Sequence, residues 1–217
     1  MTSGRSTVTW PRPDPKIAVT GVVLFWGDTL VAGSLAPGYD LTSDYVSSLA
    51  GRGSAVAPVG IVAIVFLGLA HVLAAATLRG ALGAPLALAG VAGLTIASFR
   101  TGCPLGAAGC GTAPNTVDDL PGTVHGLAVG AYEIAIVAAM LLFAFTRRRD
   151  EKVFAPISVV VAVVSVVLLL QTGAAYNGLW QRGWLLVNTG WLVAVLLTRK
   201  RVQRRREPAP PGVPAGW

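Results

Sequence analysis

Six long apolar stretches divide the chain, with shorter polar connections between them. Each stretch has about 20 residues, the length an α-helix needs to cross a hydrocarbon core of about 30 Å. Because backbone polar groups in lipid must be bonded internally, stretches of this length predict helices. We expect six spans, at residues 17–35, 55–78, 81–99, 123–146, 153–173 and 179–198. The predicted fold is all-α, a polytopic bundle of six transmembrane helices.

The composition supports a membrane protein. The mean hydropathy is +0.65, and 53% of the residues are hydrophobic whereas 12% are charged; soluble domains carry about 25% charged residues. We therefore expect three parts. These are a disordered cytoplasmic N-terminal tail at 1–16, a transmembrane domain at 17–198, and a basic, proline-rich cytoplasmic C-terminal tail at 199–217.

The basic residues predict an orientation. Of the 17 Lys and Arg residues, 14 lie in segments that six crossings place on one side; Arg52, Arg100 and Arg182 do not. Basic residues in short loops stay cytoplasmic, so both termini should be inside and the connections 36–54, 100–122 and 174–178 outside. Anionic lipid headgroups, rather than nucleic acid, are the expected partner of the basic tail. The richness in Ala, Val, Gly and Arg is typical of a GC-rich genome and indicates a bacterial plasma membrane.

The first outer connection contains a short predicted helix, Asp44 to Ala50. Ser43 is suited to cap its N-terminus, and Gly51 is suited to end it in a left-handed conformation. Five aromatic residues fall near the same outer boundary, as in an interfacial aromatic belt; they are Tyr39, Tyr45, Tyr176, Trp180 and Trp184.

The two cysteines, Cys103 and Cys110, lie in the second outer connection. Outside the cytoplasm their spacing favours a structural disulfide. A redox pair is the alternative, although catalytic dithiols usually have the tighter C-x-x-C spacing. A metal site that combines them with His125 and Asp118 or Asp119 would lack a recognised ligand spacing. We therefore predict neither a resident metal nor a cofactor.

Three ionisable residues lie inside the predicted spans: Asp28, His71 and Glu133. Charge at the bilayer centre costs at least about 2.5 kcal/mol and usually marks function. Asn188 lies at a depth similar to that of Glu133 and could join the same network. Such a set could relay protons, bind a cation or orient a headgroup; alternatively, each group is hydrogen-bonded within the bundle and fixes helix register.

The start of the fourth span also carries candidate chemistry. His125 lies near the outer boundary, in the same layer as Arg100, Asp40 and Asp44. Ser47 is a conceivable neighbour, although no hydrolase, zincin, Walker or dinucleotide motif occurs. Further along the span, a G-x-x-x-G pair, Gly126 and Gly130, is suited to close helix contact.

Three segments carry a resemblance to a known family: PGYDLTSDYVSSLAGRGS after the first span, FRTGCP after the third, and TVHGLAVGAYE opening the fourth. They resemble the bacterial and archaeal membrane proteins of the domain of unknown function 998 family, over about residues 17–198. The resemblance implies a six-helix membrane protein with no established activity. The positions of this chain that match the family's motifs are Tyr39, Ser43, Asp44, Ser47, Leu49 and His125. Where the family often has an acidic residue, this chain has Leu105 and Gly106.

We expect a polar pocket that opens to the outside. Its mouth would be lined by Asp40, Asp44, Ser47, Arg100 and His125, and its depth by Asp28, Glu133 and Asn188. The favoured function is binding or moving a small polar molecule or lipid headgroup. One alternative is an intramembrane metal-dependent hydrolase or lipid-modifying enzyme that uses His125 with Asp44 or Asp119. The other is a structural or accessory subunit with a partner in a membrane complex.

Overall fold

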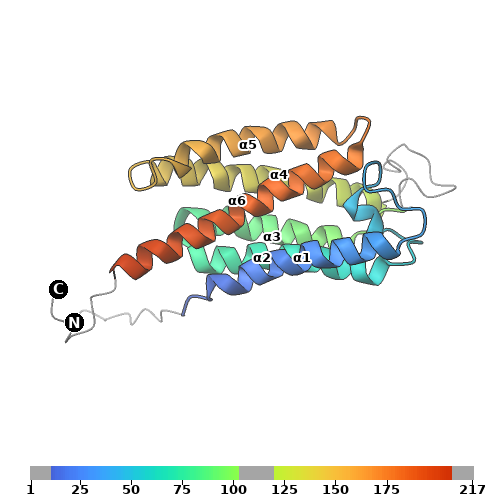
Figure 1. The fold of residues 1–217 in the computed structure, drawn as a ribbon, viewed down its shortest axis with the longest axis horizontal. Coiled ribbons are helices and arrows are strands. Elements are labelled where there is room, and N and C mark those ends of the chain that lie inside the picture. Colours follow the sequence, from blue (N-terminus) through green and yellow to red (C-terminus); the bar gives the residue numbers. More distant parts are fainter. Residues whose placement is uncertain (1–10, 103–119, 207–217) are drawn as a thin grey trace, which may run out of the picture.

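The computed structural model describes residues 11–102 and 120–206. Over these ranges the chain forms helices and no strand, which confirms the predicted all-α bundle (Figure 1). In chain order the elements are α1 (Pro15–Leu35), the 3-10 helix η1 (Val46–Ala50), α2 (Ala57–Leu78), the 3-10 helix η2 (Gly80–Leu82), α3 (Gly83–Ser98), α4 (Leu120–Arg147), α5 (Phe154–Gln171) and α6 (Asn177–Arg206).

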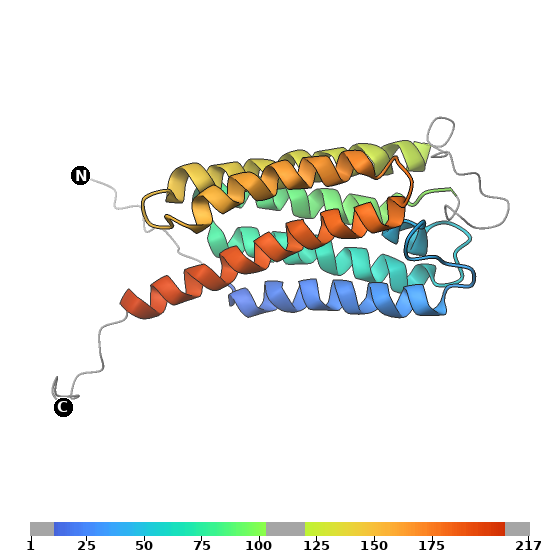
Figure 2. The same ribbon diagram turned by 45° about the horizontal axis from the view of Figure 1, so that its top comes forward.

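The six α-helices run up and down, and each packs against the next along the chain. Helix α6 crosses the bundle obliquely and also contacts α1, so that the first and last helices meet (Figure 2). Helices α1, α3 and α5 end on the same side of the bundle, where η1 also lies (Figure 1). We call this side the loop end.

Five of the described helices, α1 to α5, are long and apolar enough to cross a membrane; α3 qualifies together with η2. Helix α6 is the sixth member of the bundle but carries Gln181, Arg182, Asn188 and Thr189 in its first half. It also continues to Arg206, beyond the predicted end at 198, because Arg and Lys are good helix formers. The chain is a multi-pass membrane protein.

Glycines allow α2 and α3 to approach closely. A Cβ atom at Gly90 would lie 2.6 Å from Val72 Cγ2 and 2.8 Å from the carbonyl oxygen of Gly68, so the backbones meet where no side chain fits. The predicted close contact at Gly126 and Gly130 is wrong, because a Cβ at either position meets nothing within 4 Å in the described part of the chain.

The short outer helix also differs from its prediction. It is a 3-10 helix that begins at Val46, and its N-cap residue is Tyr45, which makes no side-chain capping bond. Ser43 is not the cap, because it belongs to the turn that precedes the helix, where the Asp44 carboxylate accepts the backbone N–H of Asp40. Gly51 is not left-handed either, since its φ is −57°.

The glycine contacts predict which substitutions the bundle tolerates. Gly90→Ala should destabilise the protein by about 1–3 kcal/mol, because the new methyl group overlaps Val72 and the Gly68 backbone. Gly130→Ala is the matched control; it should be neutral or stabilising, because alanine is the better helix former and nothing lies nearby. The thermal unfolding midpoint of each purified variant in detergent measures the difference. Equal midpoints for the two variants would contradict the close α2–α3 contact.

Candidate functional site

Arg182 of α6 holds the first connection onto the bundle. Its Nη1 donates to the carbonyl oxygens of Leu41 at 2.6 Å, Asp44 at 2.9 Å and Gly178 at 2.9 Å. Its Nη2 donates to the Tyr39 hydroxyl, and the guanidinium carbon lies 5.4 Å from the centre of the Tyr39 ring. One planar cation therefore satisfies carbonyls from two segments at once, a geometry that lysine cannot reproduce.

Three further contacts fix this connection. Gln181 Oε1 accepts the backbone N–H of Val46 at 2.5 Å, and the Tyr45 hydroxyl donates to the carbonyl oxygen of Thr172 at 2.5 Å. Gly178 allows the close approach, because a Cβ there would lie 2.6 Å from the carbonyl oxygen of Asp44. The first connection thus packs against the start of α6 as part of the folded domain.

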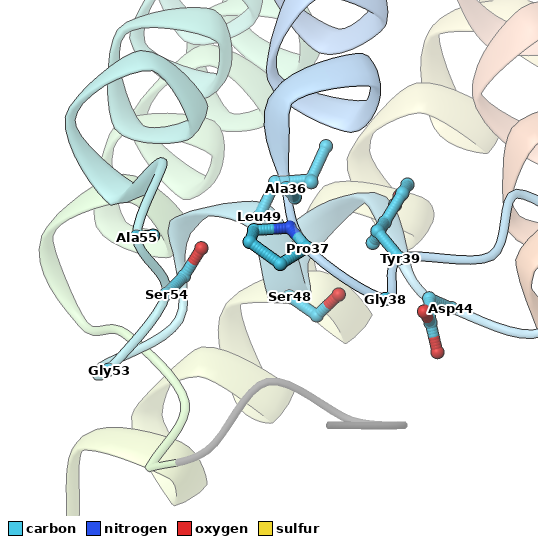
Figure 3. Close-up of a pocket in the computed structure, with 10 residues that line it drawn as sticks. All are labelled: Ala36, Pro37, Gly38, Tyr39, Asp44, Ser48, Leu49, Gly53, Ser54 and Ala55. Atoms are coloured by element: carbon cyan, nitrogen blue, oxygen red, sulfur yellow. The ribbon is translucent and has the colours of Figure 1, made fainter. Parts of the chain in front are cut away.

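A cavity of about 220 Å³ lies at the loop end, between the segment that follows α1 and the segment that leads into α2 (Figure 3). We call it the loop cavity. Its polar side chains are Tyr39, Asp44, Ser48 and Ser54. Asp44 is only 4% exposed; its Oδ2 accepts the Asp40 N–H at 2.7 Å, and no ion pair to it forms within the described ranges.

Two titratable groups beside this cavity have shifted pKa values. The hydroxyl and N–H of Thr42 both donate to Asp40 Oδ1 at 2.7 Å, and these bonds lower the pKa of the exposed Asp40 carboxyl. Burial raises the pKa of Tyr39, against the opposing effect of Arg182. Tyr39 is therefore protonated at neutral pH, and its hydroxyl donates to the carbonyl oxygen of Tyr45 at 3.1 Å.

A second, narrower cavity of about 40 Å³ lies among the helices beneath η1. We call it the helix cavity. Its walls are mainly apolar, and Ser47, Gln181 and His125 contribute polar side chains. His125 Nδ1 lies 2.9 Å from the carbonyl oxygen of Phe99. This nitrogen must carry a proton, because a carbonyl oxygen can only accept; the ring also has a backbone hydrogen bond with Ile96.

Deeper in the bundle, Glu133 is the centre of a polar cluster. Trp184 Nε1 donates to Glu133 Oε2 at 2.8 Å, and Ser165 Oγ lies 3.0 and 3.1 Å from the two carboxyl oxygens. Ser165 Oγ also lies 2.8 Å from Asn188 Oδ1. All four side chains are buried. Helices α4, α5 and α6 are thus joined by hydrogen bonds inside the bundle.

His71 has a separate set of partners. Its Nδ1 lies 2.8 Å from the carbonyl oxygen of Leu67 and therefore donates, which leaves Nε2 to accept from the Tyr132 hydroxyl at 3.2 Å. Both ring nitrogens are satisfied in a neutral imidazole. The Tyr132 ring also packs edge-on against Trp184, with centroids 5.6 Å apart, so aromatic rings separate His71 from the Glu133 cluster.

The predicted site residues divide into separate groups. Ser47 and His125 line the helix cavity, and Asp44 lines the loop cavity. Asp40 is exposed and is bonded to Asp44 through its backbone N–H. Glu133 and Asn188 share one cluster but line neither cavity.

Two predicted residues join none of these groups. Asp28 and Arg100 are half-buried and line neither of the two cavities.

Cys103, Cys110, Asp118 and Asp119 lie outside the described residues, so the disulfide stays a prediction. Within residues 11–102 and 120–206, no group of three or more His, Cys, Asp or Glu side chains could hold a metal ion.

Sequence reasoning missed Ser165 and Arg182, and it assigned Trp184 to an interfacial belt. Trp184 is buried and bonded to Glu133 instead. The sequence held a signal for the position of Trp184. The i, i+3, i+7 spacing of Gln181, Trp184 and Asn188 places all three on one polar face of α6. The sequence also held a signal for Arg182, because it is one of three basic residues on the predicted outer side.

The described helices define a multi-pass membrane protein, and the loop cavity and the helix cavity lie near one end of its bundle. The family model described as "Protein of unknown function (DUF998)" matches residues 19–198, so the chain belongs to this family. No curated protein and no solved structure matches the chain.

The contacts of Arg182 lead to a prediction about the first connection. Arg182→Lys keeps the charge but cannot reach three carbonyls and a hydroxyl together, so it should destabilise this region by about 1–3 kcal/mol. Hydrogen exchange measured by mass spectrometry should show faster exchange across residues 39–46, with the α2–α3 pair unchanged. Arg148→Lys, at an exposed position, is the control. Unchanged exchange in Arg182→Lys would contradict the assigned role.

Proposed function

We propose that the protein binds a small polar molecule or lipid headgroup in the loop cavity, and that this cavity faces the outside of a bacterial plasma membrane. The observation that carries the proposal is Asp44. Its carboxyl group is almost buried, lines a cavity of about 220 Å³ and has no cationic partner in the described part of the chain. A buried carboxylate needs a compensating charge or donors, and a ligand in the cavity would supply them.

The other polar atoms of the cavity suggest the chemistry of the ligand. Ser48 Oγ donates to the carbonyl oxygen of Tyr45 at 2.6 Å, and Tyr39 donates to the same carbonyl. With its proton used, the Ser48 hydroxyl offers lone pairs to the cavity, whereas the Tyr39 hydroxyl also accepts from Arg182. Together with Asp44 they form an acceptor-rich wall, which favours a ligand with several donors. An ammonium group, such as that of an ethanolamine headgroup, fits this requirement.

The distribution of basic residues supports the orientation. Arg79 precedes η2, and Arg147, Arg148, Arg149 and Lys152 connect α4 to α5; both connections lie at the end opposite the loop end (Figure 1). The positive-inside rule then assigns the loop end to the outside and the termini to the cytoplasm. In this orientation the basic C-terminal segment meets the anionic headgroups of the inner leaflet.

The orientation predicts the behaviour of reporter fusions. Green fluorescent protein joined to the C-terminus should fluoresce, and alkaline phosphatase joined there should be inactive, because the phosphatase needs an oxidising compartment for its disulfides. Alkaline phosphatase inserted after residue 106 should be active. The reverse pattern would place the loop cavity on the cytoplasmic side.

The proposed ligand chemistry is tested by binding. In native mass spectrometry the protein should retain phosphatidylethanolamine in preference to phosphatidylglycerol, and Asp44→Asn should reduce this retention about tenfold or more, because it removes the only buried charge of the described cavity wall. Asp150→Asn, at the opposite end, is the matched control. Free glycerophosphoethanolamine distinguishes a soluble ligand from a lipid. Equal retention by wild type and Asp44→Asn would refute the role of Asp44.

A further inference from the structure

In the Glu133 cluster, Ser165 faces more hydrogen-bond acceptors than its single hydrogen can serve. Ser165 Oγ lies within 3.1 Å of three acceptor oxygens: both carboxyl oxygens of Glu133 and Asn188 Oδ1. A serine hydroxyl carries one hydrogen and can donate to one of them at a time. If Glu133 were ionised, at least one of these short contacts would join two acceptors without a hydrogen between them.

No cation neutralises Glu133 within the described bundle. Helix α3, from Gly83 to Ser98, and helix α5, from Phe154 to Gln171, carry no charged or titratable side chain. On α6 the only charged residue before 199 is Arg182, which is bonded to the first connection. His71 of α2 has its two nitrogens bonded to Leu67 and Tyr132, and neither nitrogen contacts Glu133.

On α4 itself, the titratable neighbours of Glu133 are two. Tyr132 is bonded to His71 through its hydroxyl. His125 lies about two turns nearer the loop end, and its Nδ1 is bonded to the carbonyl oxygen of Phe99. Neither residue supplies a positive charge to the carboxyl group, and an isolated carboxylate inside a membrane is strongly disfavoured.

We propose that Glu133 is a proton-binding site and is held in the bundle as a neutral carboxylic acid. The bound proton supplies a second hydrogen for the contacts of Ser165, so that its contacts with Oε1 and with Asn188 Oδ1 both contain one. Trp184 donates to Oε2, the protonated Oε1 donates to Ser165 Oγ, and Ser165 donates to Asn188 Oδ1. This assignment stands on the cluster alone and does not rest on ligand binding at the loop cavity.

The buried amide of Asn188 offers one other arrangement. Its Nδ2 has no hydrogen-bond partner, and rotation of the amide by half a turn would point Nδ2 at Ser165. Ser165 could then donate to an ionised Glu133. The carboxylate would still have only neutral donors, from Trp184, Ser165 and Asn188, and no counter-ion among the described residues, so the protonated form is favoured.

Infrared spectroscopy of the full-length protein in lipid bilayers tests the assignment. At neutral pH, the wild-type spectrum minus the Glu133→Gln spectrum should contain the carbonyl stretching band of one protonated carboxylic acid, and this band should shift in D2O. Glutamine matches the neutral acid in shape and donor capacity, so the unfolding midpoint should be unchanged. Asp150→Asn, at an exposed position, should leave the band in place.

Two results would overturn the proposal. One is a difference spectrum that contains carboxylate bands in place of the acid band at neutral pH. The other is conversion of the acid band into carboxylate bands when sodium chloride is added, which would indicate a cation site. Ser165→Ala provides a second variant if Glu133→Gln does not fold. It removes the acceptor of the acid proton, so the band should persist and move to higher frequency; an unmoved band would also contradict the assignment.

Discussion

The polar side chains of α6 must find partners inside the bundle, and much of the structure depends on this constraint. In lipid there is no water to satisfy them, so each unpaired group costs free energy. Thr189 accepts from Trp26 of α1, Trp184 donates to Glu133 of α4, and Trp191 donates to Ser158 of α5. The oblique path of α6 across the other helices is what brings these partners within reach (Figure 2).

The same helix also organises the loop end. Gln181 and Arg182 lie less than one turn before Trp184, so the contacts that hold the first connection continue directly into the buried cluster. The start of α6 therefore holds the first connection, whose residues Tyr39, Asp44 and Ser48 line the loop cavity. This matters for a binding site, because side chains on a fixed frame keep their geometry when no ligand is present.

The spans could be predicted from sequence because membrane thickness sets their length, and α1 and α2 begin and end within two residues of expectation. Hydropathy does not encode how each helix is rotated about its axis, and that rotation decides which side chains meet. Trp184 was therefore placed at the membrane surface, although its indole is bonded to Glu133. Likewise Gly126 and Gly130 have the spacing for close packing, but the close contact is made by Gly68 and Gly90 on other helices.

Among the described residues, two carboxyl groups, those of Asp44 and Glu133, are nearly buried, and their surroundings differ. Asp44 lines the loop cavity, close to the hydroxyl groups of Tyr39 and Ser48. Glu133 is enclosed by neutral side chains from α5 and α6 and has no such opening. Trp184 links the deeper carboxyl to the surface, because its nitrogen bonds Glu133 while its ring lines the helix cavity. Displacement of that ring would remove a donor from Glu133.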